Sequence, residues 1–316
     1  MEARKTRKHP LRVKLIFNPI AGAKDESPLQ LMDIIKEMQA WNLVPEPFLI
    51  EPDCNLTNVV QEAIAQGINM VVVCGGDGTV ESVARAMVGT NAVLGVIPGG
   101  TANNIALSLN IPKDIPSAIA LLRNGLRSKV DIGIATVGGV VTPLIEVCSV
   151  GLFSTLYSSA DDIQHGDLGK VGDFVSKAIS TPPSEIHFIL DNKKEVKMLG
   201  HIVLITNMPY IGNNLRVGAL NSYNDGFLDV LFFADLTKFD IIGSILKGIG
   251  PDNVEDPRIQ RYKVRKIHIH TQPPMPILID NMNIGEGSIH IEVKRRALTI
   301  MTGRVNPPIV ERDTNT

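Results

Sequence analysis

The sequence predicts a two-domain protein, with an α/β domain over residues 11–128 and an antiparallel β-sandwich over residues 129–305. Two observations predict this division. Up to residue 128, apolar runs of strand length alternate with runs of helical periodicity, which is typical of a parallel sheet with flanking helices. Beyond residue 128, strand-like runs follow one another and are joined by turn signals, which is typical of antiparallel sheets. Residues 1–10 and 306–316 are predicted to be loose termini.

Each element of the first domain follows from the spacing of its apolar residues. Strands are rich in β-branched residues, whereas helices place apolar residues three or four positions apart. Glycine ends two of the helices, at Gly67 and Gly125. The expected strands cover residues 13–17, 47–51, 70–74 and 93–97, and the expected helices cover residues 28–41, 56–66, 105–109 and 115–124, with a further helix starting at Val80.

The second domain is predicted to consist mainly of strands. The pair Gly138-Gly139 between two apolar runs indicates a hairpin. Two stretches of helical periodicity interrupt the strands, at residues 167–180 and 237–249. The expected strands cover residues 129–137, 140–148, 185–191, 195–206, 228–233, 264–271, 276–280, 287–293 and 297–301.

Composition restricts the possible functions. The chain of 316 residues has a formal net charge of −2, so no excess of positive charge favours a nucleic-acid partner. No apolar run reaches the roughly 18 residues that a transmembrane helix needs, and the basic N-terminus lacks the apolar core of a signal peptide. The three cysteines follow no metal or disulfide spacing. These features predict a cytoplasmic protein without a transmembrane segment.

The run from Gly75 to Thr79 carries the strongest chemical signal. An apolar strand ends there in Gly75, Gly76 and Gly78 around the single carboxylate of Asp77, and a helix follows. Glycines let the backbone approach a ligand closely, and the start of a helix favours phosphate. A carboxylate beside phosphates repels them unless a cation lies between the two. The competing interpretation is a tight turn with an aspartate near a helix start.

Two further strands end in loops of the same kind. Asn18, Pro19 and Gly22 follow the strand at residues 13–17, and a loop with Gly100, Thr101 and Asn103 follows the strand at residues 93–97. In a parallel sheet such loops collect at the carboxyl edge, where open α/β sheets bind ligands. Together the three loops predict a phosphate-binding site at that edge.

The three loops resemble those of the diacylglycerol kinase catalytic domain family, which includes bacterial lipid kinases and the sphingosine kinases. Residues 18–22 match its Asn-Pro-x-x-Gly, and residues 75–79 match its Gly-Gly-Asp-Gly-Thr at every position. Pro98, Gly100, Thr101 and Asn103 match its Pro-x-Gly-Thr-x-Asn-Asp. In the second domain, residues 225–230 resemble Asp-Gly-x-Leu-Asp-Val, and residues 276–280 resemble the strand before a late Asp-Gly-Glu. The resemblance implies an NAD kinase-like α/β domain followed by a sandwich.

The cofactors implied by the resemblance are ATP and Mg²⁺. We expect the backbone N–H groups of Gly76, Gly78 and Thr79 to bind the nucleotide phosphates, with the hydroxyl groups of Thr79 and Thr101 as further donors. Asn18 is expected to close the nucleotide side through its amide, and Asp77 to hold the catalytic Mg²⁺. No Gly-Lys-Ser/Thr pair is present, so the loop is not of the Walker type.

Two carboxylates of the second domain receive roles from the resemblance. Asp225 corresponds to a residue that binds a structural Mg²⁺ together with two carbonyl groups, here those of Ser222 and Phe227. Asp280 corresponds to the region that deprotonates the lipid hydroxyl. Their residue types also permit a simpler interpretation, because aspartate is common in turns and at strand ends.

One departure from the family concerns the late Asp-Gly-Glu, which here is Asp280-Asn281-Met282. A thioether accepts no proton at neutral pH, so Met282 cannot replace a glutamate base. The nearest following carboxylate is Glu286, which either compensates or belongs to a surface loop. Asp280 alone could serve as base, or the protein turns over poorly.

The first hypothesis is therefore an ATP-dependent lipid kinase that converts diacylglycerol to phosphatidic acid during transient contact with the membrane surface. The second is an NAD kinase-like enzyme, which would share the Gly-Gly-Asp-Gly-Thr loop. The third is a weakly active or silent homologue that binds nucleotide and lipid, as Met282 suggests. The edge strands of the second domain make a homodimer a further expectation.

Overall fold

The computed structural model describes residues 9–21, 27–152, 154, 182–211, 215–219, 222–233 and 259–304. Gly22 and the helices predicted over residues 167–180 and 237–249 lie outside the described residues. Most of the two termini predicted to be loose lies outside them as well.

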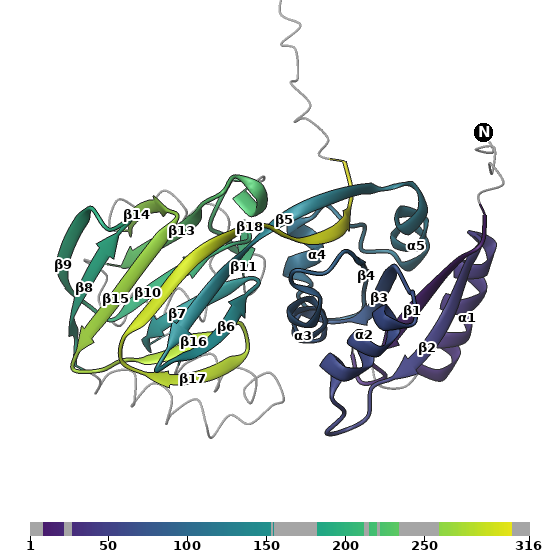
Figure 1. Ribbon diagram of the computed structural model, residues 1–316, viewed down its shortest axis with the longest axis horizontal. Helices are drawn as coiled ribbons and strands as arrows, with labels where there is room; N and C mark the ends of the chain where they lie inside the picture. The colour runs from purple at the N-terminus through teal and green to yellow at the C-terminus, as the bar shows by residue number, and fades with distance from the viewer. Residues whose placement is uncertain are drawn as a thin grey trace, which may run out of the picture.

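A parallel sheet forms the N-terminal part, with the strand order β2-β1-β3-β4 (Figure 1). Every residue of β3 and β4 is buried, as expected for strands with helices on both faces. β2 begins four residues earlier than predicted, because it pairs with β1 from Leu43 opposite Leu11 onward. The strands are β1 (Leu11–Phe17), β2 (Leu43–Leu49), β3 (Met70–Gly75) and β4 (Val93–Pro98).

The helices of this part divide between the two faces of the sheet. Fully buried residues four positions apart, such as Ile34 and Met38, form the stripe that one helix packs against the strands. On one face lie α1 (Ser27–Ala40) and α5 (Ile115–Asn124). On the other lie α2 (Leu56–Ala65), α3 (Asp77–Met87) and α4 (Asn104–Ser108).

Two antiparallel sheets form the C-terminal part and enclose a core between them. Phe188 and Phe232 meet in this core, edge to face, with ring centroids 5.5 Å apart. The predicted antiparallel sandwich is therefore confirmed. One sheet contains β7 (Val147–Gly151), β10 (Ile202–Thr206), β13 (Leu228–Phe233), β14 (Ile259–Val264), β16 (Pro276–Ile279) and β17 (Met282–Glu286). The other is the antiparallel part of a ten-stranded sheet whose remaining strands are β1, β2, β3 and β4. This part contains β5 (Leu126–Val137), β6 (Val140–Leu144), β8 (Ser184–Leu190), β9 (Lys194–Gly200), β15 (Lys266–Gln272) and β18 (Ile289–Thr302).

The long strands β5 and β18 join the two parts (Figure 1). β18 pairs antiparallel with β15 and β5, and its last residues pair parallel with β4, with Thr299 opposite Val93. Ala297 and Leu298 accordingly belong to the core of the α/β part. A bulge in β18 contains Arg296 in the left-handed region, and its N–H donates to buried Asp131 at 2.6 Å.

Several strand boundaries differ from the prediction. Residues 287–293 and 297–301 form one strand, β18, because the bulge lets the chain keep its pairing with β5. Residues 195–206 instead form two strands, β9 and β10. Residues 282–286, not expected to be a strand, pair with β16 as β17. The division of the chain at residue 128 remains a prediction.

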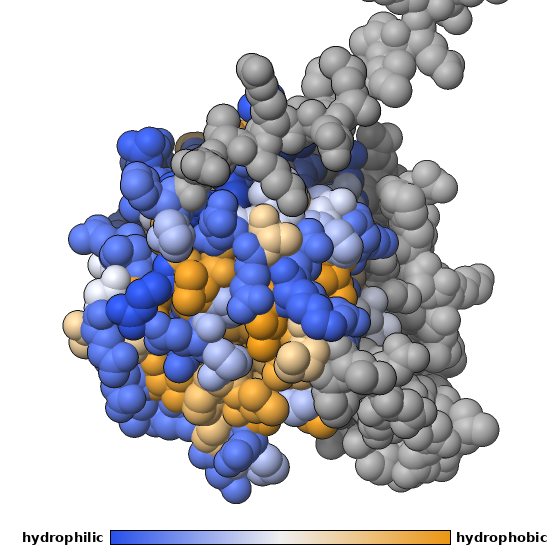
Figure 2. Space-filling model, turned by 90° about the vertical axis from the view of Figure 1, so that its right-hand side faces the viewer, coloured by the Kyte–Doolittle hydropathy of each residue, from blue (hydrophilic) through white to orange (hydrophobic). Residues whose placement is uncertain are grey.

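The outer face of the α/β part exposes scattered apolar side chains among polar ones (Figure 2). β2 is the edge strand of the sheet and exposes Val44 and Leu49. Pro45 and Pro47 supply no N–H group, which opposes pairing of this edge with another strand. Among the helices that the structure describes, none has the length and apolarity that crossing a bilayer requires.

The short elements near the second domain's turns complete the fold. β11 (Tyr210–Ile211) and β12 (Leu215–Arg216) form a two-stranded ladder, and the 3₁₀ turn η1 (Ser222–Asn224) precedes β13. The turn η1 contacts β5, so residues 222–227 lie beside the strand that links the two parts.

Candidate functional site

The first two predicted loops are bonded to each other. Asn18 follows β1, and its N–H donates to the carbonyl of Cys74 in β3 at 2.9 Å. Its amide Nδ2 donates to Thr79 Oγ1 at 2.9 Å, while its Oδ1 accepts from the N–H of Ile20. Asn18 therefore holds the loop that contains half-buried Pro19 against the start of α3. The side-chain amide of Asn18 therefore already forms hydrogen bonds within the protein.

The glycines of the second and third loops pack against each other. A Cβ atom built on Gly100 would lie 2.5 Å from the Cα atom of Gly76, and one built on Gly76 would lie 3.3 Å from that of Gly100. The N–H of Gly99 donates to the carbonyl of Gly75 at 3.0 Å. The close approach that requires glycine at these positions is therefore an approach of one loop to the other.

Asp77 links the second loop to helix α4. One carboxylate oxygen accepts from the N–H of Asn104 at 3.0 Å, and the other accepts from the N–H of Ile105 at 3.1 Å. These are the first residues of α4, whose free N–H groups favour a negative charge. Burial raises the pKa of Asp77, and the backbone hydrogen bonds oppose this shift. The N–H of Asn103 is a third backbone donor close to this carboxylate, which leaves about one of its four acceptor positions for a cation.

The third loop is closed by Asn103, which adopts a left-handed backbone conformation with φ of 54°. Its Nδ2 donates to the carbonyl of Gly100 at 2.6 Å, and the N–H of Gly100 donates to its Oδ1 at 2.9 Å. The exposed residue Thr101 lies at the tip of this closed loop. Asn103 thus shapes the loop, and Thr101 is placed at its surface.

At the start of α3, the structure differs from the predicted phosphate-binding N–H groups in the role of Thr79. The N–H of Thr79 donates to the carbonyl of Gly76 at 3.1 Å, so it is bonded within the first turn. The N–H groups of Asp77 and Gly78 precede it in that turn, where a helix offers no internal acceptor. These two N–H groups are better placed for an anion than that of Thr79.

Helix α3 carries a line of three charged residues, of which the sequence analysis singled out Asp77 alone. Consecutive members of the line Asp77, Glu81 and Arg85 are four positions apart, so all three share one face of the helix. Glu81 is only 3% exposed, and Arg85 Nη2 lies 3.7 Å from its Oε2 atom. Burial, followed by the negative charge of Asp280, raises the pKa of Glu81 well above its ordinary value. The four-residue spacing was the available signal for this line of charges.

Asp280 reaches this face of α3 from the sandwich. Its Oδ2 accepts from Arg85 Nη2 at 2.7 Å and from the N–H of Ile145 at 3.2 Å. Its Oδ1 accepts from the N–H groups of Glu146 and Val147 at 2.9 and 3.1 Å. A carboxylate offers about four acceptor positions, and here four donors use them. For Asp280 to act as a base, one donor would have to withdraw.

The neighbours of Asp280 complete this contact between the two parts. Asn281 Nδ2 donates to Glu81 Oε2 at 3.1 Å, and it also lies 3.0 Å from a Cβ atom built on Gly78. Met282 and Glu286 begin and end β17, roughly 13 Å apart along an extended strand. Glu286 is exposed at the far end of that strand. In this arrangement it does not take the place of a carboxylate at position 282.

The three residues predicted to hold a structural Mg²⁺ are close together, and Asp225 and the carbonyl of Ser222 already form bonds within the protein. Asp225 Oδ1 accepts from the N–H of Phe227 at 2.9 Å, and Asp225 Oδ2 lies 2.6 Å from Lys263 Nζ. The carbonyl of Ser222 accepts from the N–H of Asp225 at 3.5 Å. The hydrogen bond that Lys263 Nζ donates to Asp225 Oδ2 raises the pKa of Lys263. The ammonium group thus occupies Asp225 Oδ2, and Mg²⁺ would have to displace it to bind there. The metal site at Ser222, Asp225 and Phe227 stays a prediction.

Within the described part of the chain, no three His, Cys, Asp or Glu side chains form a group that could hold a metal ion. Asp77 is the single carboxylate of the glycine loops, so a cation there would need further ligands from water or phosphate.

Comparison with known proteins matches both parts of the chain. Residues 12–135 match the family described as "Diacylglycerol kinase catalytic domain", and residues 177–302 match the "YegS C-terminal NAD kinase beta sandwich-like domain". A diacylglycerol kinase of Bacillus subtilis is 22% identical over 276 residues, covering 85% of this chain and 89% of that protein. A diacylglycerol kinase of Mycobacterium tuberculosis is 24% identical over 219 residues, covering 67% of this chain and 70% of that protein.

Solved structures agree in fold. A crystal structure of a diacylglycerol kinase from Bacillus anthracis superposes with a TM-score of 0.68 at 20% sequence identity. The superposition covers 95% of this chain and 98% of that one. The likeness therefore extends over both the α/β part and the sandwich.

Proposed function

Because the chain belongs to the diacylglycerol kinase-like family, we propose that it is an ATP-dependent lipid kinase. Membership of this family supports a lipid kinase in general terms. The γ-phosphoryl group of ATP would pass to a lipid hydroxyl, with diacylglycerol as the acceptor and phosphatidic acid as the product. The acceptor lies in a membrane, so the enzyme would contact the membrane surface during each turnover.

One observation carries this proposal: three polar loops meet at the carboxyl edge of the parallel sheet. Asn18 bonds to Thr79, Gly76 packs on Gly100, and Asp77 bonds to the start of α4. Two helix N-termini therefore converge beside a carboxylate. Helix N-termini attract anions, and carboxylates attract the cations that accompany polyphosphates.

The residues of these loops would bind and orient the nucleotide. The N–H groups of Asp77 and Gly78 would donate to phosphate oxygens, and Thr101 would add a hydroxyl donor from the tip of the third loop. Asp77 would hold Mg²⁺, which when bound neutralises charge on the phosphates. Phosphoryl transfer needs mainly such positioning and charge neutralisation, so these few groups account for most of the required chemistry.

The lipid hydroxyl must also lose a proton, and Asp280 is our candidate for accepting it. Its longest hydrogen bond, 3.2 Å from the N–H of Ile145, is the one that a substrate hydroxyl would replace first. A base must come within hydrogen-bond reach of the hydroxyl, so substrate binding would have to open this corner of the sandwich.

A second candidate function follows from the same corner. Asp280 has all four acceptor positions in use, and Met282 offers no carboxylate beside it. Both features favour a protein that binds nucleotide and lipid but transfers phosphate slowly or not at all. An NAD kinase-like activity is the third possibility, since the Gly-Gly-Asp-Gly-Thr loop is shared.

Radiolabelled ATP offered with mixed micelles of diacylglycerol, and separately with NAD, tests these alternatives. Label in the lipid supports the lipid kinase, label in NAD supports the NAD kinase, and ATP binding without transfer supports the silent homologue. The matched variant is Asp77→Asn, which keeps the side-chain shape and removes the charge. We expect transfer to fall by on the order of 100-fold or more in this variant. Transfer at the wild-type rate would refute the role of Asp77.

A further inference from the structure

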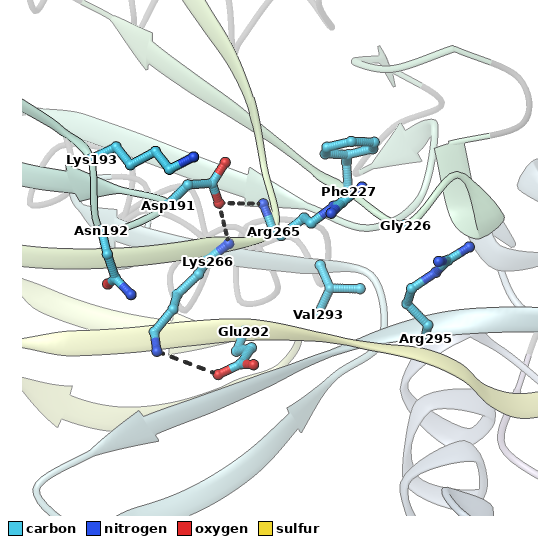
Figure 3. Close-up of a pocket in the computed structure, with 10 residues that line it drawn as sticks. All are labelled: Asp191, Asn192, Lys193, Gly226, Phe227, Arg265, Lys266, Glu292, Val293 and Arg295. Atoms are coloured by element: carbon cyan, nitrogen blue, oxygen red, sulfur yellow. Dashed lines mark hydrogen bonds and ion pairs between the residues drawn. The ribbon is translucent and has the colours of Figure 1, made fainter.

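A pocket of about 460 Å³ opens on the sandwich, away from the three loops (Figure 3). Four segments surround it: the turn between β8 and β9, the two residues before β13, the turn between β14 and β15, and the middle of β18. None of its lining residues belongs to the glycine loops or to the corner around Asp280. The pocket therefore has no part in the proposed phosphoryl transfer.

Positive charge dominates this pocket. Four cationic side chains line it together with two carboxylates, which leaves an excess of two positive charges in a chain whose formal net charge is −2. A local excess of one sign within a concave surface attracts ions of the opposite sign. The cationic residues are Lys193, Arg265, Lys266 and Arg295, and we refer to the site as the basic pocket.

The two carboxylates of the basic pocket are already engaged. Asp191 Oδ1 accepts from the backbone N–H groups of Arg265 and Lys266 at 2.8 and 2.9 Å, so it shapes the β14–β15 turn (Figure 3). Glu292 pairs with Lys266 at 3.6 Å. Within the described part of the chain, neither carboxylate forms an ion pair with Lys193, Arg265 or Arg295.

The protein holds two guanidinium groups of the basic pocket in place. The guanidinium carbon of Arg265 lies 4.9 Å from the centroid of the Phe227 ring, and Figure 3 shows the side chain passing alongside that ring. The Nε atom of Arg295 lies 3.1 Å from a Cβ atom built on Gly226, so the missing side chain of Gly226 makes room for it. Stacking and packing restrict both side chains before any ligand binds, which lowers the entropy lost on binding.

We propose that the basic pocket binds a phosphate group. Guanidinium groups match phosphate oxygens in geometry and charge, and a lysine adds a mobile positive charge. Two sources carry this chemistry: a soluble phosphate or phosphate ester, and the headgroup of an anionic phospholipid. A headgroup in this pocket would hold the sandwich at a membrane surface, whereas a soluble phosphate would make the pocket a ligand site.

The experiment compares the wild-type chain with the double variant Arg265→Gln and Arg295→Gln. The matched control is the double variant Arg127→Gln and Arg304→Gln. Both arginines are exposed and lie outside the pocket, and replacing them removes the same amount of positive charge. The single variant Lys193→Gln, in an exposed turn, is included in case the double variant does not fold. Melting temperature is measured with inorganic phosphate against sodium chloride of equal ionic strength. Co-sedimentation is measured with phosphatidylcholine vesicles, with and without phosphatidylglycerol.

A phosphate-dependent rise in melting temperature that is lost in the pocket variants supports a soluble phosphate ligand. Co-sedimentation with phosphatidylglycerol vesicles that weakens in the pocket variants supports a headgroup. In that case we expect roughly 25-fold weaker binding for the double variant, since each cationic side chain near an anionic surface contributes about fivefold. If the pocket and control variants respond alike to both probes, the proposal is overturned.

Discussion

Arg85 is predicted to carry a large part of the contact between the α/β part and the sandwich. Its guanidinium lies 2.7 Å from Asp280 and 3.7 Å from Glu81, and both carboxylates are buried. Replacement by methionine keeps most of the aliphatic volume and removes the charge. The buried carboxylate of Asp280 is then left without its cation, and Glu81 loses its positively charged neighbour. We therefore expect Arg85→Met to lower the free energy of unfolding strongly.

The magnitude follows from three terms. Removing one partner of a buried ion pair costs about 3–5 kcal/mol, because an uncompensated charge stays buried. Asp280 keeps three backbone donors, which places the loss at the lower end of that range. The Nε atom of Arg85 is buried without a hydrogen-bond partner among the described residues, so its removal returns about 1 kcal/mol. The expected net loss is about 2–3 kcal/mol.

Urea unfolding followed by circular dichroism measures this loss at neutral pH. The control is Arg12→Met, since Arg12 pairs with Glu46 at 2.6 Å but the two side chains are 61% and 34% exposed. Exposed pairs of this kind contribute about 0–1 kcal/mol. If Arg85→Met costs no more than Arg12→Met, the buried network does not stabilise the contact and our reasoning fails.

Three other variants test separate parts of the structure. Gly100→Ala should lower the free energy of unfolding by about 1–3 kcal/mol and weaken ATP binding, because its Cβ atom would lie 2.5 Å from the Cα atom of Gly76. Gly76→Ala should lower the free energy of unfolding less, because its Cβ atom would lie 3.3 Å from the Cα atom of Gly100. The reverse order in urea unfolding would contradict the packing argument. MgCl₂ should raise the melting temperature of Lys263→Met but not that of the wild type, since Asp225 loses its ammonium partner in the variant. A rise already present in the wild type would show that the ion pair does not exclude the metal. Glu81→Gln tests the buried carboxyl, whose raised pKa lets the folded protein keep a proton that the unfolded chain has released. The wild-type free energy of unfolding should therefore fall as pH rises from about 4.5 through the folded pKa, and the variant should lack this component; equal pH slopes for both proteins would argue against it.

Local pattern was sufficient for most of the fold. Runs such as Val71 to Cys74 are apolar at every position, and in the structure they are strands buried on both faces. Boundaries were less predictable where tertiary contacts set them. β17 forms because Met282 to Glu286 find β16 as a partner, and β18 continues through a bulge because Asp131 accepts from the N–H of Arg296.

The candidate site was predictable in position but not in contacts. The loops at Asn18, Gly75 and Gly100 were expected at one sheet edge because parallel strands share their carboxyl ends, and the structure places them there. The charged face of α3 was missed, although Asp77, Glu81 and Arg85 show helical spacing. Nothing in the local sequence indicates that Asp280 lies against this face, because Arg85 and Asp280 are 195 positions apart.

The sequence by itself determined the class of fold, the order of the glycine loops and the kind of ligand they suit, since these depend on periodicity and on short segments. The tertiary structure alone decided what the key groups touch. It places Gly76 on Gly100, four donors on Asp280 and an ammonium group on Asp225. Such contacts form when segments distant in the sequence pack together. They depend on the free energy of folding of all the sheets together, which no single stretch of the sequence determines.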